Sequence, residues 1–175
     1  MNNNLIENYD PFLKTAIVRK DLSKPMKILH KKQLLHGNIL EFGCGHHECC
    51  DILKSEHNYR IEGYDKFNPQ YKDESLLIDY YDTVTCNYVF NVIHDLIEHQ
   101  ELITQLRLLS NNIFISVRSD KKAIQSTWVY DDNSLGYWTS RQSFQRFYNK
   151  ELVNKLFGRV EYVHSDGALI LFKLT

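Results

Sequence analysis

The sequence predicts one α/β domain with a mostly parallel sheet, helices on both faces and an antiparallel hairpin at its carboxyl end. Residues 38–64 read as a strand, a glycine-containing turn, a helix and a second strand that stops before an acid. The apolar segments 82–92 and 112–117 have the character of buried parallel strands. Two short strands, 158–164 and 168–174, flank a Ser-Asp-Gly turn that favours a hairpin.

The composition is that of a globular protein with one core. The chain has 175 residues, 43% of them hydrophobic and 25% charged, which suffices for a single domain over residues 1–175. We divide it into a helical extension, 1–37, and a core, 38–175. The net charge of −1 gives no overall attraction to nucleic acid. No apolar run reaches membrane-spanning length, so we expect a cytoplasmic protein without a membrane partner; its oligomeric state stays open.

Histidines and cysteines cluster after the glycine turn and raise the question of a metal. Adjacent cysteines on a helix point to different faces, and no second ligand pair is evident, so we predict no metal site. We expect the thiols of an intracellular protein to be reduced, and here buried and inert. The residues concerned are His46, His47, Cys44, Cys49, Cys50 and, in a later strand, Cys86.

The segment from Lys14 to Lys32 is locally basic, with seven lysines or arginines and one acid. Ser23 as a cap, Pro25 in the first turn and a stop at Gly37 predict a helix within it. Either its lysines form a solvated face, or Lys14, Arg19 and Lys20 line the substrate entrance and meet phosphate or another anion, such as the backbone of a nucleic acid.

The glycine turn is the most informative stretch. Gly43 and Gly45 directly follow a strand, so the backbone can approach a ligand and a helix begins beside it. Asp65, at the end of the next strand, can bind both hydroxyls of a ribose. His46 and His47 occupy the place of the third glycine of the dinucleotide fingerprint, which disfavours a pyrophosphate. The pattern therefore indicates an adenosine-type ligand.

Residues 66–75 are polar, contain a proline and predict a loop. A helix and a third strand usually follow in this type of domain, and only residues 75–78 could be that strand, which would be short. We expect the region to be abbreviated or irregular, so the sequence does not determine how the adenine pocket is formed.

The segment 82–92 predicts a central strand with Asn87, Tyr88 and Asn91 at or beyond its carboxyl end, where parallel sheets bind ligands. Tyr88 could instead be a core aromatic, whereas two asparagines so placed need hydrogen-bond partners. Asn87 is not followed by two prolines, which argues against the active site of N6-adenine and N4-cytosine DNA methyltransferases.

A helix is predicted over residues 96–109. His94 and Asp95 precede it, and because adjacent residues seldom face each other, Asp95 is expected to cap the helix and not to form a catalytic pair. The following strand ends at Arg118, which either meets substrate or pairs with Asp120.

Residues 121–139 are polar and aromatic without a clear period, and we expect a long lid or binding loop. Its two tryptophans either stack on a planar substrate or lie in the core. Residues 141–148 lead into a short helix, 150–157, and offer Gln145 and Tyr148 as substrate contacts.

Several segments together resemble the DNA phosphorothioation-associated putative methyltransferases and their short, phage-like relatives. The matching stretches are KTAIVRKDLSKPMKIL, ILEFGCG with Asp51 behind it, GYD, YDTVTCNYVFNVI, and TSRQSFQRFY followed by EL. The resemblance implies a Rossmann-like class I fold that uses S-adenosylmethionine (SAM). It also implies that Glu41, Gly43, Gly45 and Asp65 bind SAM. His47 departs from the common pattern, which has a glycine there, and would crowd the methionine end of SAM; relatives are also often longer.

We therefore predict a SAM-dependent methyltransferase whose acceptor is a nucleic acid or a nucleotide-like nitrogen, since no strong base stands out. Glu41 is expected near the methionine amino group, with Asn87 and Tyr88 beside the transferring methyl. The alternatives are a small-molecule methyltransferase and a non-catalytic SAM-binding or partner-binding protein. The complete SAM site is predicted to comprise Glu41, Gly43, Cys44, Gly45, Asp65, Lys66 and Asn87, and the substrate site Lys14, Arg19, Asn91, Arg118, Gln145 and Tyr148.

Overall fold

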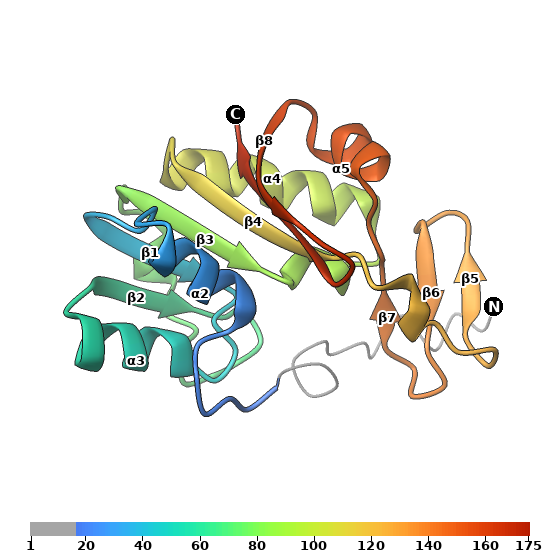
Figure 1. Ribbon diagram of the computed structural model, residues 1–175, viewed down its shortest axis with the longest axis horizontal. Helices are drawn as coiled ribbons and strands as arrows, with labels where there is room; N and C mark the ends of the chain where they lie inside the picture. Colours follow the sequence, from blue (N-terminus) through green and yellow to red (C-terminus); the bar gives the residue numbers. More distant parts are fainter. Residues whose placement is uncertain (1–16) are drawn as a thin grey trace.

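The computed structural model describes residues 17–175, so Lys14 lies outside the described residues. A six-stranded sheet in the order β2-β1-β3-β4-β9-β8 forms its centre. β1 to β4 are parallel, β9 runs antiparallel to β4 and β8 antiparallel to β9, which confirms the predicted fold class (Figure 1). The strands are β1 Asn38–Phe42, β2 Arg60–Tyr64, β3 Thr83–Asn87, β4 Ile113–Arg118, β8 Val160–Ser165 and β9 Leu169–Leu174.

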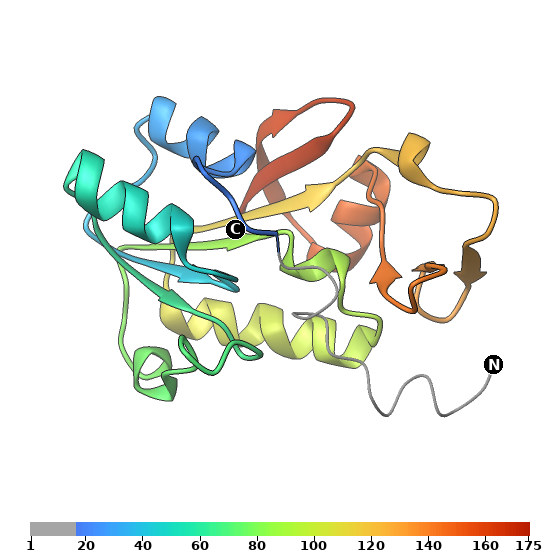
Figure 2. The ribbon, with the colours of Figure 1, turned by 90° about the horizontal axis from the view of Figure 1, so that it is seen from below.

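Helices cover both faces of this sheet, as seen edge-on in Figure 2. On one face lie α2 (Lys24–Lys31) and α3 (Glu48–His57), and on the other α4 (Leu96–Leu109) and α5 (Lys150–Phe157). Successive strand residues point to opposite faces, so a strand with apolar residues at neighbouring positions contributes to two apolar clusters. Within β1, Ile39 joins the cluster under α2 and α3, whereas Leu40 joins the cluster under α4 and α5. No helix in the described part of the chain is long and apolar enough to cross a membrane.

Helix starts follow the sequence, with one exception. Asp95 caps α4, its carboxylate accepting the Ile97 N–H at 2.7 Å, which confirms the capping role. Ser23 occupies the cap position of α2, but its hydroxyl makes no capping bond and is buried without a partner among the described residues. The predicted Ser23 cap bond is therefore wrong. Pro25 lies in that first turn, where its missing N–H costs no helical hydrogen bond.

Between β2 and β3 the chain forms no strand. Glu74–Leu77 is a short 3₁₀ helix, η2, capped by Asp73, so the region is irregular and β2 is an edge strand of the large sheet over residues 17–175. The loop before η2 folds back over the glycine turn, because the Asn68 side-chain amide donates to the Gly45 carbonyl at 2.7 Å.

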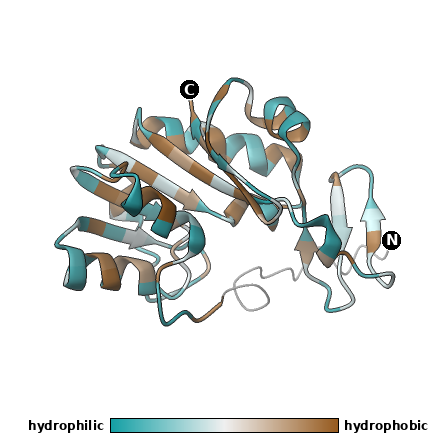
Figure 3. Ribbon diagram, in the orientation of Figure 1, coloured by the Kyte–Doolittle hydropathy of each residue, from teal (hydrophilic) through white to brown (hydrophobic). Residues whose placement is uncertain are grey.

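The expectation of one long loop at residues 121–139 is wrong. The chain there forms η4 (Lys121–Ala123), β5 (Val129–Asp131) and β6 (Gly136–Trp138), and β7 (Phe144–Gln145) completes a three-stranded antiparallel sheet. These strands are too short for a period-2 pattern to stand out in the sequence. The small sheet lies beyond the carboxyl ends of β1 to β4 (Figure 1). Figure 3 shows hydrophobic residues along β3 and β4, whereas β5 and β6 are largely pale.

Candidate functional site

A cavity of about 840 Å³ lies at the carboxyl ends of β1 to β4. These strands are parallel, so the residues that follow them meet at one edge of the sheet. The volume is typical of small-molecule sites. Of the predicted site residues, those in the cavity wall are Arg19, Glu41, Gly43, Cys44, Gly45, Asp65, Lys66, Asn87, Tyr88, Asn91, Arg118 and Gln145.

The glycine turn after β1 has a backbone that only glycine adopts without strain. Gly43 and Gly45 have φ values of +75° and +63°. A Cβ on Gly43 would lie 2.2 Å from the Val89 side chain, whereas a Cβ on Gly45 would meet nothing within 4 Å. The N–H groups of Gly43 and Cys44 both donate to the Tyr64 carbonyl, at 2.7 and 3.0 Å. The turn is thus tied to the end of β2 and leaves open space beside Gly45.

His47 does not crowd this site, so that expectation is wrong. Its φ of +71° is the left-handed conformation for which a glycine would be the usual choice. The ring stacks on Tyr71, with centroids 4.5 Å apart and planes 10° apart, and Nδ1 lies 2.9 Å from the Asp51 carboxylate. It fills the space over Gly63, where a Cβ would be 2.3 Å from the histidine ring. The side chain is therefore directed to the α3–β2 side, and it is absent from the cavity wall.

Glu41 places a buried carboxylate at the cavity. It is 4% exposed, and burial raises the pKa of its side chain to about 7. Its hydrogen-bond partners are the Cys50 thiol at 3.2 Å and the Asn87 amide at 3.4 Å, a weak set for a carboxylate. Within residues 17–175 no cationic group lies at ion-pair distance from it. Such a group fits a ligand that brings its own positive charge.

Asp65 is held rigidly at the opposite side of the turn. It is 8% exposed, and its carboxylate accepts the Gly45 N–H at 2.9 Å. The other oxygen accepts the backbone N–H groups of Phe67 and Asn68, at 2.9 and 3.2 Å. These bonds fix the carboxylate at the cavity wall and leave it acceptor capacity, since a carboxylate has about four lone-pair sites. Lys66, next to it, pairs with Glu98 at 3.2 Å.

Asn87 and Tyr88 end β3 at the cavity. The Ser116 hydroxyl donates to the Asn87 side-chain oxygen at 3.0 Å, which sets the direction of the amide. Tyr88 has a φ of +63°, a strained conformation for a bulky residue. Strain of this kind concentrates at ligand sites, and here it directly follows the Asn87 amide.

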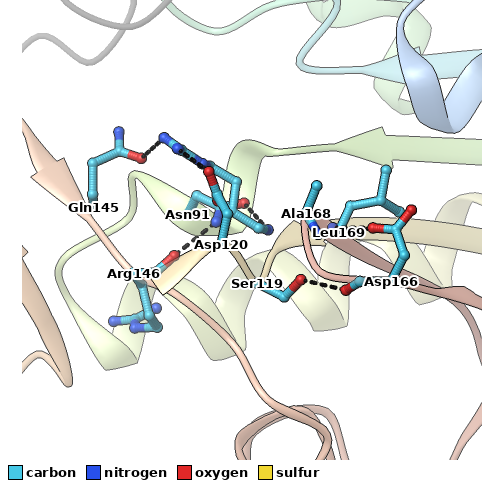
Figure 4. Close-up of polar contacts among 9 residues, drawn as sticks. Asn91, Ser119, Asp120, Gln145, Arg146, Asp166, Ala168 and Leu169 are labelled. Carbon is cyan, nitrogen blue, oxygen red and sulfur yellow. Dashed lines mark hydrogen bonds and ion pairs between the residues drawn. The ribbon is translucent and has the colours of Figure 1, made fainter. Parts of the chain in front are cut away.

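Asn91 lies at the cavity but does not present a free amide to it. It is 1% exposed, its Nδ2 donates to the Arg146 carbonyl at 2.7 Å, and its Oδ1 accepts the Arg118 N–H at 3.3 Å (Figure 4). Both ends of the amide thus join β4 to the segment that contains β7. We correct the predicted substrate role to a structural one.

Arg118 pairs with Asp120, one of the two alternatives, and does so in the cavity wall. Its guanidinium donates to both carboxylate oxygens, at 3.0 and 2.8 Å, and to the Gln145 amide oxygen at 3.2 Å (Figure 4). It also lies 5.0 Å above the centre of the Phe147 ring. The arginine charge is therefore neutralised within the wall.

Tyr148 lies in the core, so the predicted substrate contact is wrong. It is 1% exposed, and its hydroxyl donates to the Phe90 carbonyl at 3.0 Å. Burial raises its pKa to about 12, so the phenol stays protonated. Arg19, by contrast, lines the cavity, and its backbone N–H donates to Glu48 at 3.0 Å.

The sequence gives no sign of one further residue, Arg146, and it considers a second, His94, only as a partner of Asp95. Arg146 is fully buried, and its guanidinium donates to the carbonyls of Ser134 (2.6 and 3.0 Å), His94 (3.3 Å) and Phe90 (3.5 Å). An arginine in a polar segment reads as a surface residue, so no local signal marks it. His94 lines the cavity, with its ring 5.5 Å from that of Trp138.

The four cysteines are buried and unbridged. Burial raises the pKa of each thiol, strongly at Cys44, Cys50 and Cys86, so they remain protonated and unreactive. Over the described range 17–175, no group of three or more His, Cys, Asp or Glu side chains is arranged to hold a metal ion.

Comparison with known proteins gives one family and one fold. The family described as "Methyltransferase domain" matches residues 15–160. Among solved structures, 1,6-didemethyltoxoflavin-N1-methyltransferase of Burkholderia thailandensis, with bound 1,6-didemethyltoxoflavin and S-adenosylhomocysteine (SAH), is 14% identical with a TM-score of 0.54, over 86% of this chain and 76% of that one. A SAM-dependent methyltransferase of Methanosarcina mazei is 16% identical with a TM-score of 0.55, over 87% and 98%. The DhpI–SAH complex is 12% identical with a TM-score of 0.52, over 95% and 87%. No curated protein matches the chain.

Proposed function

The chain belongs to the methyltransferase domain family, and from that premise we propose that it methylates a nitrogen of a nucleic acid or nucleotide-like acceptor. It is a SAM-dependent methyltransferase by family and fold, and the identity of the acceptor is the proposed part. The narrower kinship with the DNA phosphorothioation-associated putative methyltransferases, carried by the motifs at both ends of the chain, is part of the same proposal.

One observation carries the assignment of the SAM site. Glu41 is a buried carboxylate that lacks a cationic partner among the described residues and faces a cavity. The ligand ammonium of a methionine moiety would supply that partner. Asp65 would then hold the ribose, and the open side of Gly45 would admit the ligand backbone. These residues fit SAM.

SAM, when bound, supplies an electrophilic methyl group on a sulfonium. The chain's own residues would orient the acceptor nitrogen. Asn87, directed by Ser116, and Gln145, bound to Arg118, present amides in the cavity wall, and amides recognise the donor and acceptor edges of nitrogen heterocycles. The imidazole of His94 lines the same cavity and can accept a proton when the acceptor has one to lose.

The basic amino-terminal segment contributes less to nucleic-acid binding than its composition indicates. Lys24 pairs with Asp166 at 2.6 Å, and Lys27 pairs with Asp21. Arg19 lies at the cavity and does not continue the basic face of α2. We retain nucleic acid as the proposed partner and place most of its contact near the cavity mouth.

Transfer of a labelled methyl group from SAM tests the acceptor. We expect label in single-stranded DNA or RNA, or in nucleotides, and loss of nucleic-acid binding between low and moderate salt. Label only in a small-molecule fraction would favour the small-molecule alternative. SAM binding without transfer to nucleic acid, nucleotides or crude cell extract would favour the non-catalytic alternative.

The small-molecule alternative keeps one observation in its favour. A cavity of about 840 Å³ is large enough to hold two small ligands side by side, without a polymer. The Burkholderia neighbour named above is an N1-methyltransferase of a small molecule, but at 14% identity it shares only the fold.

A further inference from the structure

The small sheet β5–β7 carries an aromatic face, which we define as Trp128, Tyr130, Tyr137 and Phe147. Tyr130 pairs with Tyr137 across β5 and β6, with ring centroids 4.9 Å apart. The Phe147 ring lies 6.2 Å from that of Trp128, nearly parallel at 26°, and 6.3 Å from that of Tyr137. Tyr130 remains 46% exposed at the outer end of this series. The four rings form one connected series, in which Phe147 is buried and Trp128, Tyr130 and Tyr137 are the members that a ligand can reach.

This face is continuous with the wall of the cavity. Directly opposed residues of an antiparallel pair point to the same side, and Tyr137 is opposed to Gln145, which lines the cavity. The Arg118 guanidinium, also in the cavity wall, lies over the Phe147 ring. Val129 and Trp138, paired with each other, point to the opposite side of the small sheet.

Exposed cationic residues flank the strands of the small sheet along the chain. Lys121 and Lys122 form the exposed η4 turn between β4 and β5, and Arg141 is exposed between β6 and β7. Flat rings next to exposed cations are the combination that binds single-stranded nucleic acid, because bases stack on the rings and phosphates meet the cations. Tyr130 does not line the cavity, so a single heterocycle held there leaves Tyr130 uncontacted.

We propose that the aromatic face of β5–β7 binds a single strand of nucleic acid and leads one base into the cavity. The proposal rests on the proposed function, since it supplies the strand from which the acceptor base comes. Bases of any kind have a flat face, so the contact is tolerant of sequence. The strand must be single, because stacked and paired bases in a duplex do not offer their faces to the protein.

Binding of a fluorescein-labelled single strand of about 12 nucleotides tests this surface directly. The variant is Tyr130→Ala, and the matched control is Val129→Ala, a neighbour that is 56% exposed on the opposite side of the same strand. We expect Tyr130→Ala to weaken binding roughly tenfold and Val129→Ala to change it by about twofold or less. Trp128→Phe, which keeps a flat ring, should retain most of the affinity.

Three results would overturn the proposal: equal effects of Tyr130→Ala and Val129→Ala, equal binding of single strand and duplex, or no binding of either at low salt. Calorimetry with SAM and methyl transfer to free nucleotides, run on the same proteins, distinguish failure of this proposal from failure of the proposed function. Methyl transfer to nucleotides without strand binding would refute the binding role of the aromatic face and leave the proposed function intact. No transfer to any nucleotide or nucleic acid would remove the proposed function itself.

Discussion

Two buried charged side chains, Arg146 in the core and Glu41 in the cavity wall, differ in how fully their hydrogen-bonding groups are satisfied. The Arg146 guanidinium donates to three backbone carbonyls and to the Tyr148 hydroxyl. The Glu41 carboxylate has one thiol and one long amide contact, and burial raises its pKa to about 7. A buried charge with a complete set of partners stabilises the fold, whereas an incomplete set facing a cavity marks the place of a ligand.

The largest effect should follow from removing the satisfied charge. Arg146→Met leaves the carbonyls of Ser134, His94 and Phe90 buried without their donor. We expect a loss of about 3–5 kcal/mol in the free energy of unfolding and a drop in Tm on the order of 10 °C. Thermal denaturation measures it, with the exposed Arg141→Met as the control. Equal Tm values for the two variants would show that the hydrogen bonds of the buried Arg146 do not stabilise the fold.

On the ligand side, Asp65→Ala should remove most of the SAM affinity. Hydrogen bonds to a charged group contribute about 1.5–3 kcal/mol, so we expect a loss of roughly 10- to 100-fold or more. Calorimetry measures it, with Glu62→Ala as the control, since Glu62 is an exposed acid on β2, the strand that Asp65 directly follows. Unchanged SAM affinity in Asp65→Ala would show that Asp65 does not bind the ribose.

Because the burial of Glu41 disfavours its ionised form, the free energy of unfolding should depend on pH. Its pKa is about 7 in the folded protein and 4.5 in the unfolded chain, so the folded state binds more protons between these values. The wild type therefore loses stability as pH rises from about 4.5 through about 7, and Glu41→Gln does not. Without ligand we expect the variant to be more stable by roughly 1–3 kcal/mol at about pH 8 and nearly equal at about pH 4.5.

Chemical denaturation of both proteins across this pH range measures the difference. His99 titrates in the opposite sense, because burial lowers its pKa to about 3, but it is common to both proteins and cancels. A Glu41→Gln variant that is less stable than the wild type at about pH 8 would show that the carboxylate is satisfied in the folded protein.

The smallest effect belongs to a charged pair at the surface. Lys24 and Asp166 lie 2.6 Å apart with side chains 50% and 33% exposed. We expect Lys24→Met to change the free energy of unfolding by less than about 1 kcal/mol, because water screens such pairs. Urea denaturation checks this, and a change as large as that of Arg146→Met would show that burial does not govern the ranking.

Much of the fold could be predicted because its signals are local. The turn at Gly43 and Gly45, the hydrophobic pattern of β3 and β4, and the hairpin turn between β8 and β9 each reveal their structure within a few residues. The small sheet could not be predicted from the sequence, because β7 spans two residues and β5 and β6 span three each. Too few residues repeat for a period to be seen.

The candidate site also has one part that the sequence predicts and one part that it does not. Strand ends place Asp65, Asn87 and Arg118 at one edge, which follows from a parallel sheet alone. Whether a side chain there is free depends on partners distant in sequence. Asn91 and Tyr148 are engaged by residues 55 and 58 positions away, so their structural roles emerge only in the folded chain.

The measurement that tests the central claim most directly is calorimetric titration with SAM of the wild type and Glu41→Gln. We predict micromolar binding by the wild type that strengthens from about pH 6 to about pH 8, because a bound ammonium favours the ionised carboxylate. Glu41→Gln should bind at least about tenfold more weakly at about pH 8, without that pH dependence. Equal affinity of the two proteins, or no binding of SAM by the wild type, would contradict the assignment of Glu41 and of the cavity to SAM.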